Sequence, residues 1–166
     1  MNFSKFVLML AVLTLLFSGC SEKEKVVDNQ AQAFKVLQTA LLDTNSIFEQ
    51  TTTQQNNAVP ILNPHYGSDL NKVETKLNQN FDQKITKELM EHYLTTQKKN
   101  ESIVLKANEN GAVDSYFQIH NPTKLNLSDF IIEGDSKLYK FTTKNHHTFT
   151  IKWIDSKTGY KVTDYI

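Results

Sequence analysis

The spacing of apolar residues changes near Asn100, and this change constrains the fold more than any other feature of the chain. Before Asn100, apolar residues recur three and four positions apart, which is the spacing of one helix face. After it, apolar and polar residues alternate in short runs, which is typical of antiparallel strands with one covered face. Helices grouped before strands predict an α+β fold, with N-terminal helices packed on one face of a curved antiparallel sheet.

Three helices are predicted in the first part. The longest spans residues 26–50, and its apolar stripe fits either a core-facing seam or, as an alternative, a coiled coil. A second helix begins after Ser68 or Asp69, because a short side-chain oxygen can accept hydrogen bonds from the free N–H groups of a first turn. A third helix runs from about residue 82 or 86 to residue 98, after a break at residues 80–82.

The second part predicts strands joined by tight turns. Residues 103–107 and 113–120 predict a hairpin about residues 108–111, because Asn and Gly readily adopt positive φ. Residues 125–133 predict a short strand or a turn of helix. The C-terminal part predicts a three-strand meander with strands at residues 137–143, 147–154 and 160–165.

The core has to form without a disulfide, since Cys20 is the only cysteine. Ten Phe, six Tyr and one Trp can bury the required area. Six aromatic residues of the strand half form a candidate pocket between sheet and helices, and the alternative is that they fill the core completely. They are Phe117, Tyr139, Phe141, Phe149, Trp153 and Tyr160.

The N-terminus carries an apolar run at residues 6–17 after the positive charge of Lys5. About a dozen residues are too few to span a membrane and match the apolar region of a signal peptide. The small residues Ser18 and Gly19 precede Cys20. This segment resembles a bacterial lipoprotein signal peptide with its lipobox, although Phe17 stands where Leu is commonest.

That resemblance implies cleavage before Cys20 and attachment of diacylglyceryl and palmitate-type chains there. Residues 1–19 would be the signal peptide, residues 20–25 a lipidated tether, and residues 26–166 one α+β domain. Two or more acyl chains give a stable membrane anchor, so the domain is expected on the extracytoplasmic face of a cell membrane. The alternative is an ordinary signal peptide that leaves a free thiol at position 20.

Charge and motifs favour binding over catalysis. The chain has 18 Lys, no Arg and 18 acidic residues in an interspersed pattern, which does not predict a nucleic-acid partner. It lacks a Gly-x-Ser-x-Gly elbow and clustered glycines. His146 and His147 are adjacent in a predicted turn, and adjacent residues point apart on a strand. The sequence therefore predicts no enzyme, no cofactor and no metal.

The order of elements across residues 26–166 resembles cystatin-like and nuclear-transport-factor-2-like domains of small bacterial lipoproteins. The break at residues 80–82, with its central aromatic, is also similar to cell-wall endopeptidase inhibitor proteins of bacilli. The anchor, the neutral charge and the lack of catalytic groups favour a binding module of the cell envelope, engaging an envelope protein, peptidoglycan or a small ligand. The alternative is an inhibitor or modulator of a cell-wall hydrolase, acting through residues 51–67 or the turns at 108–111 and 155–159.

Overall fold

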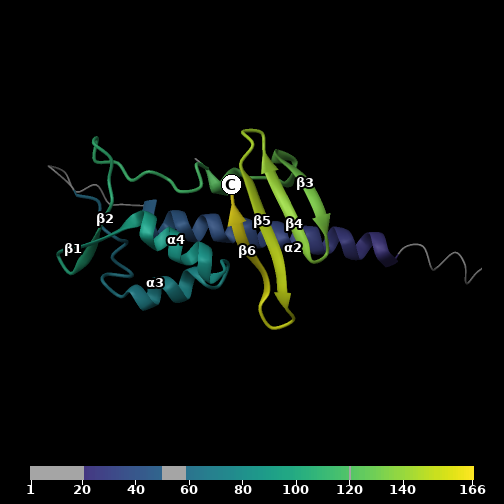
Figure 1. The fold of residues 1–166 in the computed structure, drawn as a ribbon, viewed down its shortest axis with the longest axis horizontal. Coiled ribbons are helices and arrows are strands. Elements are labelled where there is room, and N and C mark those ends of the chain that lie inside the picture. Colours follow the sequence, from purple (N-terminus) through teal and green to yellow (C-terminus); the bar gives the residue numbers. More distant parts are fainter. Residues whose placement is uncertain (1–20, 50–58, 120) are drawn as a thin grey trace, which may run out of the picture.

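A computed structural model describes residues 21–49, 59–119 and 121–166, and Figure 1 shows their arrangement. The long helix α2 (Ser21–Thr44) runs the length of the molecule and ends in a π-helical turn, η1 (Asn45–Glu49). The predicted signal peptide, Cys20 and most of the polar loop after residue 50 lie outside the described residues.

The helix α2 starts at Ser21 rather than at residue 26, so the predicted tether at residues 21–25 is helical. Its first buried side chain is Ala33, and none of the side chains described at residues 28–32 is buried. Twelve residues of helix extend about 18 Å. Figure 1 shows this first part of α2 projecting beyond the sheet.

The remainder of α2 packs against its own domain, which confirms the core-facing seam. Phe34 contacts Phe141 of the sheet with ring centroids 5.9 Å apart. Leu37 is completely buried against the same core. The apolar stripe is therefore occupied by the sheet and the other helices, and no coiled coil is needed to cover it.

Two short helices follow, α3 (Leu70–Leu77) and α4 (Gln83–Tyr93). Asp69 caps α3 by accepting a hydrogen bond from Lys72 N at 3.1 Å, which confirms the predicted cap. The break between the helices is also confirmed. There, Phe81 is buried and forms a parallel bridge with Val162 of the sheet.

The third helix ends at Tyr93, five residues before its predicted end. Leu94 is extended and begins β1 (Leu94–Lys99), which pairs antiparallel with β2 (Ser102–Leu105). The turn between them places Asn100 at φ 50° and Glu101 at φ 63°. Asn tolerates this left-handed conformation well.

The predicted hairpin between residues 103–107 and 113–120 is wrong, because β2 pairs with β1 instead. Residues 106–119 stay irregular, and two tyrosine hydroxyls bind their backbone. Tyr116 N donates to the Tyr93 hydroxyl at 2.8 Å, and the Tyr165 hydroxyl donates to Phe117 O at 2.7 Å. The turn at residues 108–111 forms within this irregular segment.

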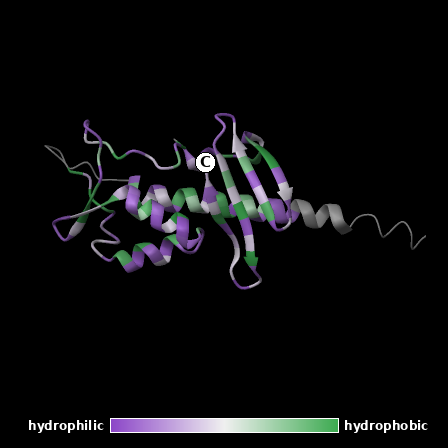
Figure 2. Ribbon diagram, viewed as in Figure 1, coloured by the Kyte–Doolittle hydropathy of each residue, from purple (hydrophilic) through white to green (hydrophobic). Residues whose placement is uncertain are grey.

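The main sheet has four antiparallel strands in sequential order. The predicted meander is confirmed, and one strand is added before it in the region predicted as a strand or a turn. Apolar and polar residues alternate along the strands, as Figure 2 shows, and α2 covers the apolar face. The strands are β3 (Phe130–Asp135), β4 (Leu138–Thr143), β5 (Thr148–Asp155) and β6 (Gly159–Tyr165).

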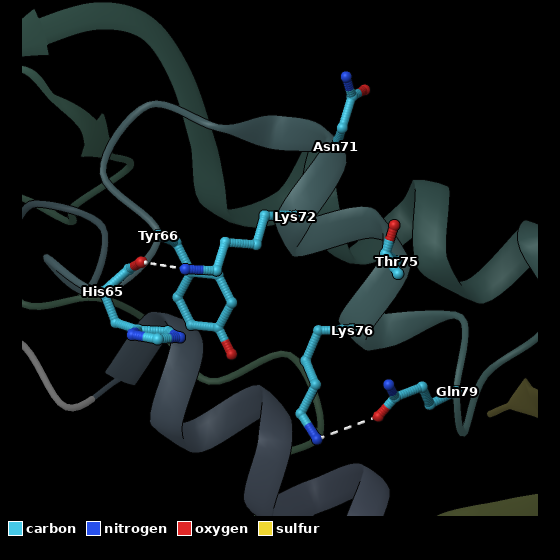
Figure 3. Close-up of a pocket in the computed structure, with 7 residues that line it drawn as sticks. All are labelled: His65, Tyr66, Asn71, Lys72, Thr75, Lys76 and Gln79. Carbon is cyan, nitrogen blue, oxygen red and sulfur yellow. Dashed lines mark hydrogen bonds between the residues drawn. The ribbon is translucent and has the colours of Figure 1, made fainter.

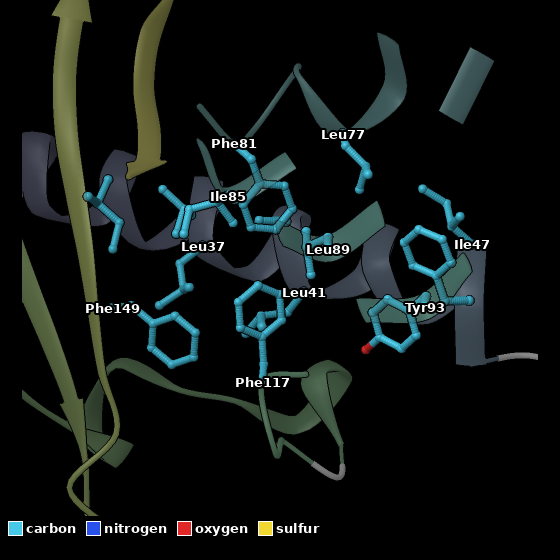
Figure 4. Packing of buried hydrophobic residues seen from close by; sticks show 14 of the residues in the cluster. Leu37, Leu41, Ile47, Leu77, Phe81, Ile85, Leu89, Tyr93, Phe117 and Phe149 are labelled. Atoms are coloured by element: carbon cyan, nitrogen blue, oxygen red, sulfur yellow. The ribbon is translucent and has the colours of Figure 1, made fainter. Parts of the chain in front are cut away.

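One contiguous cluster of buried residues joins α2, α3, α4 and the sheet. Figure 4 shows Leu37 and Leu41 of α2 among side chains of α4 and of the strand half. Within it, Phe81 and Phe117 stack with ring centroids 5.6 Å apart. The α+β architecture, with helices on an antiparallel sheet, is therefore confirmed.

Candidate functional site

The six aromatic residues of the predicted pocket lie in or against the core. All but Trp153 are buried, and Trp153 is half-buried with its ring 5.0 Å from Tyr160. Phe117 reaches Phe149 at 5.6 Å from the irregular segment rather than from a strand. Tyr139 lies 6.1 Å from both Phe141 and Tyr160. Two open cavities on the described part of the chain are lined by other residues.

The other residues considered in the sequence analysis, Cys20, His146 and His147, do not form a common site among the described residues. Cys20 lies outside the described residues. His146 is in the turn after β4 with φ 66°, and the His147 ring stacks on Tyr165 at 5.7 Å. No group of three or more His, Cys, Asp or Glu suited to a metal ion occurs within residues 21–49, 59–119 and 121–166. None of the helices in those ranges has the length and hydropathy to cross a membrane.

An open cavity of about 490 Å³ lies along α3 and the loop before it. We call it the Tyr66 groove, and Figure 3 shows its walls. The loop contributes His65 and Tyr66, and the exposed side of α3 and the turn after it contributes polar side chains. The lining residues are His65, Tyr66, Asn71, Lys72, Thr75, Lys76 and Gln79.

The local fold explains why these residues meet. Val73 and Leu77 of α3 are completely buried, so positions 72, 75, 76 and 79 fall on the opposite, solvated side of the chain. The loop turns toward this face because Tyr66 N donates to Asn63 O at 2.9 Å, and Gly67 adopts φ 57°.

The two lysines of the groove differ in their partners. Lys76 Nζ lies 3.0 Å from Asp43 Oδ2 of α2 and donates to Gln79 Oε1 at 3.2 Å. Lys72 Nζ donates to His65 O at 2.8 Å and lies 5.7 Å from the centroid of the Tyr66 ring. Within the part of the chain that the structure describes, no carboxylate lies within 4.0 Å of Lys72 Nζ.

Tyr66 supplies an aromatic wall with a neutral phenol. Burial raises the pKa of Tyr66, Lys76 lowers it, and Asp43 raises it again. The hydroxyl therefore keeps its proton at neutral pH and can donate a hydrogen bond. The His65 ring meets the Tyr66 ring edge-on, with centroids 5.1 Å apart.

A second open cavity, of about 550 Å³, lies along α3 and α4. It includes Glu74 and Glu91, so its charges are mixed, and Lys87 lies 3.7 Å from Glu91. The Tyr66 groove, in contrast, has no carboxylate in its lining and an excess of donors. It is therefore the better candidate for a ligand that carries negative charge.

Sequence reasoning did not single out the Tyr66 groove. The only available signal was a polar helix face beside a loop aromatic, and most solvated helices show the same pattern. No protein-family model matches the chain, and neither a curated protein nor a solved structure matches it. The geometry of the groove and the N-terminal motif therefore carry the functional argument.

Proposed function

We propose that this chain is a lipid-anchored, extracytoplasmic binding module of the cell envelope that holds its ligand in the Tyr66 groove. The observation that carries the proposal is the groove itself, an open cavity whose lining combines an aromatic ring, amides, a hydroxyl and an ammonium group that has no carboxylate partner among the described residues. Small-molecule sites commonly fall in the range of about 300–1,000 Å³ with a few convergent polar groups.

The length of α2 separates the proposed anchor from the groove. Cys20 immediately precedes Ser21, the first residue of α2, and Asp43 near the helix end pairs with Lys76 of the groove. At 1.5 Å per residue these two points are about 33 Å apart. Figure 1 shows α3 at the end of the molecule opposite the start of α2. A module moored at Cys20 would hold the groove away from the membrane surface.

The lining of the groove supports binding more than turnover. It contains no Asp, Glu, Ser or Cys, and among the described residues no hydrogen bond joins its one histidine ring, His65, to the Thr75 hydroxyl. Its donors are exposed and can replace hydrogen bonds that a polar ligand makes with water.

The anchor is tested by labelling cells with an alkyne analogue of palmitate. Full-length protein should carry the label and sediment with membranes, and the Cys20→Ser variant should do neither. Mass spectrometry of the mature N-terminus should give an acylated Cys20. An intact leader, or a trimmed N-terminus without acyl mass, would overturn the lipid anchor.

The groove is tested by sedimentation of the detergent-solubilised full chain with isolated cell envelopes. Thr75→Trp places an indole inside the groove and should abolish retention. Thr123→Trp, at an exposed position before β3, is the matched control and should be retained like the unchanged protein. Equal retention of both variants would show that the groove is not the binding site.

A further inference from the structure

We propose that the ligand of the Tyr66 groove is an acidic sugar, a glycan unit bearing one carboxylate or phosphate group. This inference rests on the proposed function, because it names the ligand class of the same site. It follows from the charge, the free hydrogen-bonding groups and the aromatic wall of the groove.

The charge of the groove is concentrated on one side chain. Lys76 is neutralised by Asp43 at 3.0 Å, so its ammonium serves to fix α3 on α2. Lys72 has a backbone carbonyl and an aromatic face as its neighbours, and neither cancels a full charge. One uncompensated ammonium suits one anionic group, because lysine binds carboxylate and phosphate as a point charge.

The neutral groups of the groove suit hydroxyls and amides. Asn71 and Thr75 are exposed, and their side chains make no hydrogen bond to any described residue. Gln79 uses its oxygen toward Lys76, which leaves its amide N–H groups available to a ligand. These positions are spaced along about two turns of chain, so they can reach separate substituents of one polar ring.

The aromatic wall of the groove also limits the class of ligand that fits. The Tyr66 ring is half-buried beside the polar groups, and its neutral hydroxyl can donate or accept. Apolar ring surface next to hydroxyl and amide partners suits the mixed faces of a sugar. A nucleotide with several phosphates would need more than one cation without a carboxylate partner, and among the described residues of the lining Lys72 is the one lysine of this kind.

The experiment compares three sugars that share one core. N-acetylglucosamine is neutral, N-acetylmuramic acid adds a lactyl carboxylate, and N-acetylglucosamine 6-phosphate adds a phosphate. Titrated at low salt into the full chain in detergent, the acidic sugars should bind about tenfold more tightly than the neutral one. Tighter binding of N-acetylmuramic acid would indicate a carboxylated wall sugar as the ligand. Tighter binding of N-acetylglucosamine 6-phosphate would indicate a phosphate-bearing polymer.

The variant Lys72→Gln keeps a donor for His65 O but removes the charge. It should bring the affinity for the acidic sugars down to that for N-acetylglucosamine, with all three sugars measured on the same variant. Lys152→Gln, an exposed position on β5, is the matched control and should preserve the preference. Thermal unfolding of both variants shows whether they remain folded, so that a lower affinity can be assigned to the removed charge.

Three results would overturn the inference: equal affinity for acidic and neutral sugars, a preference that survives in Lys72→Gln, or no binding of any of the sugars. These results differ from failure of the proposed function. If envelope retention still distinguishes Thr75→Trp from Thr123→Trp, the groove binds a ligand and only its chemical class is wrong. If that distinction is absent, the binding site itself is wrong.

Discussion

The two ends of the core pack aromatic side chains in different ways. Over the sheet, Phe141 and Phe149 are completely buried among other rings and carry no polar atom. At the end of α2, the Tyr93 ring stacks on Phe48 with centroids 4.3 Å apart, but its hydroxyl enters a polar network. At Phe141 and Phe149 the first end depends on apolar burial. The second depends also on each hydrogen bond being made.

The polar network uses both sides of the Tyr93 hydroxyl. It donates to Glu49 Oε1 at 2.7 Å and accepts from Tyr116 N at 2.8 Å. Asn45 Nδ2 donates a hydrogen bond to the second oxygen of Glu49 at 2.9 Å, so both oxygens of this carboxylate have partners and one of the bonds lies within the π-helical turn. Nearby, the Tyr116 hydroxyl donates to Glu88 Oε2 at 2.8 Å. The bond to Tyr116 N gives a partner to one backbone group of residues 113–119, which form no strand.

The largest expected effect is at the apolar end. Phe149→Ala removes a ring with no exposed surface and should lower the free energy of unfolding by about 3–5 kcal/mol, because transfer and cavity costs add. Urea denaturation followed by circular dichroism measures the change. Ile131→Ala, at a side chain 67% exposed on β3, is the control and should change stability by about 0.5 kcal/mol or less. A loss near that of the control would mean that the apolar end is loosely packed.

Removing one hydroxyl at the polar end should have the second largest effect. Tyr93→Phe keeps the ring but leaves Tyr116 N and one oxygen of Glu49 without their partner, at an expected cost of about 2 kcal/mol. The control is Tyr160→Phe, whose hydroxyl makes one bond, to Ser136 O, and which should cost about 1 kcal/mol. Equal costs in the two variants would contradict a network that depends on both of its bonds.

The two ends also differ in how far the sequence predicted them. The meander was predictable because period-2 alternation places Phe149 and Ile151 on one face, and the structure buries both. Residues 113–120 alternate in the same way, yet within residues 113–119 the backbone of Tyr116 and Phe117 bonds to tyrosine hydroxyls from distant elements. Alternation reports which side chains are buried and does not report which group pairs with the backbone.

The candidate site was less predictable than the fold. The helix cap at Asp69 and the break at Phe81 follow from local rules, and both were predicted. The pairing of Lys76 with Asp43 joins two helices that are far apart in the sequence, and no local rule specifies it. That pairing is what leaves Lys72 as the unbalanced charge of the groove, so the site emerges only from the tertiary arrangement.

Raising the pH should reduce the stability that depends on the Tyr93 hydroxyl. Burial, aided by Glu49, raises the pKa of Tyr93 above its ordinary value. The folded state then keeps a proton that the unfolded chain loses above pH 10, so this stability is present below pH 10 and is lost as the pH rises further. At pH 11 the loss is roughly 1.4 kcal/mol.

This pH dependence is measured as a difference between variants. The cost of Tyr93→Phe should shrink between pH 8 and pH 11 by roughly that amount, because the variant has no phenol to titrate at this position. The cost of Phe149→Ala should stay constant over the same range, so it controls for the general alkaline loss from other buried tyrosines. A constant cost for Tyr93→Phe would mean that the Tyr93 pKa is ordinary.

The smallest effect is expected at the outer part of the polar network. Burial and the bond to Glu88 raise the pKa of Tyr116, but both side chains are only partly buried. Water can replace the bond in Tyr116→Phe, so the expected cost is about 0.5 kcal/mol. The double variant with Tyr93→Phe tests whether the network acts as one unit. A cost smaller than the sum of the single costs would place both hydroxyls in one cooperative cluster, because each single variant already loses their coupling. Simple additivity would instead confine the polar end to the contacts of Tyr93 with Glu49 and with the backbone of Tyr116.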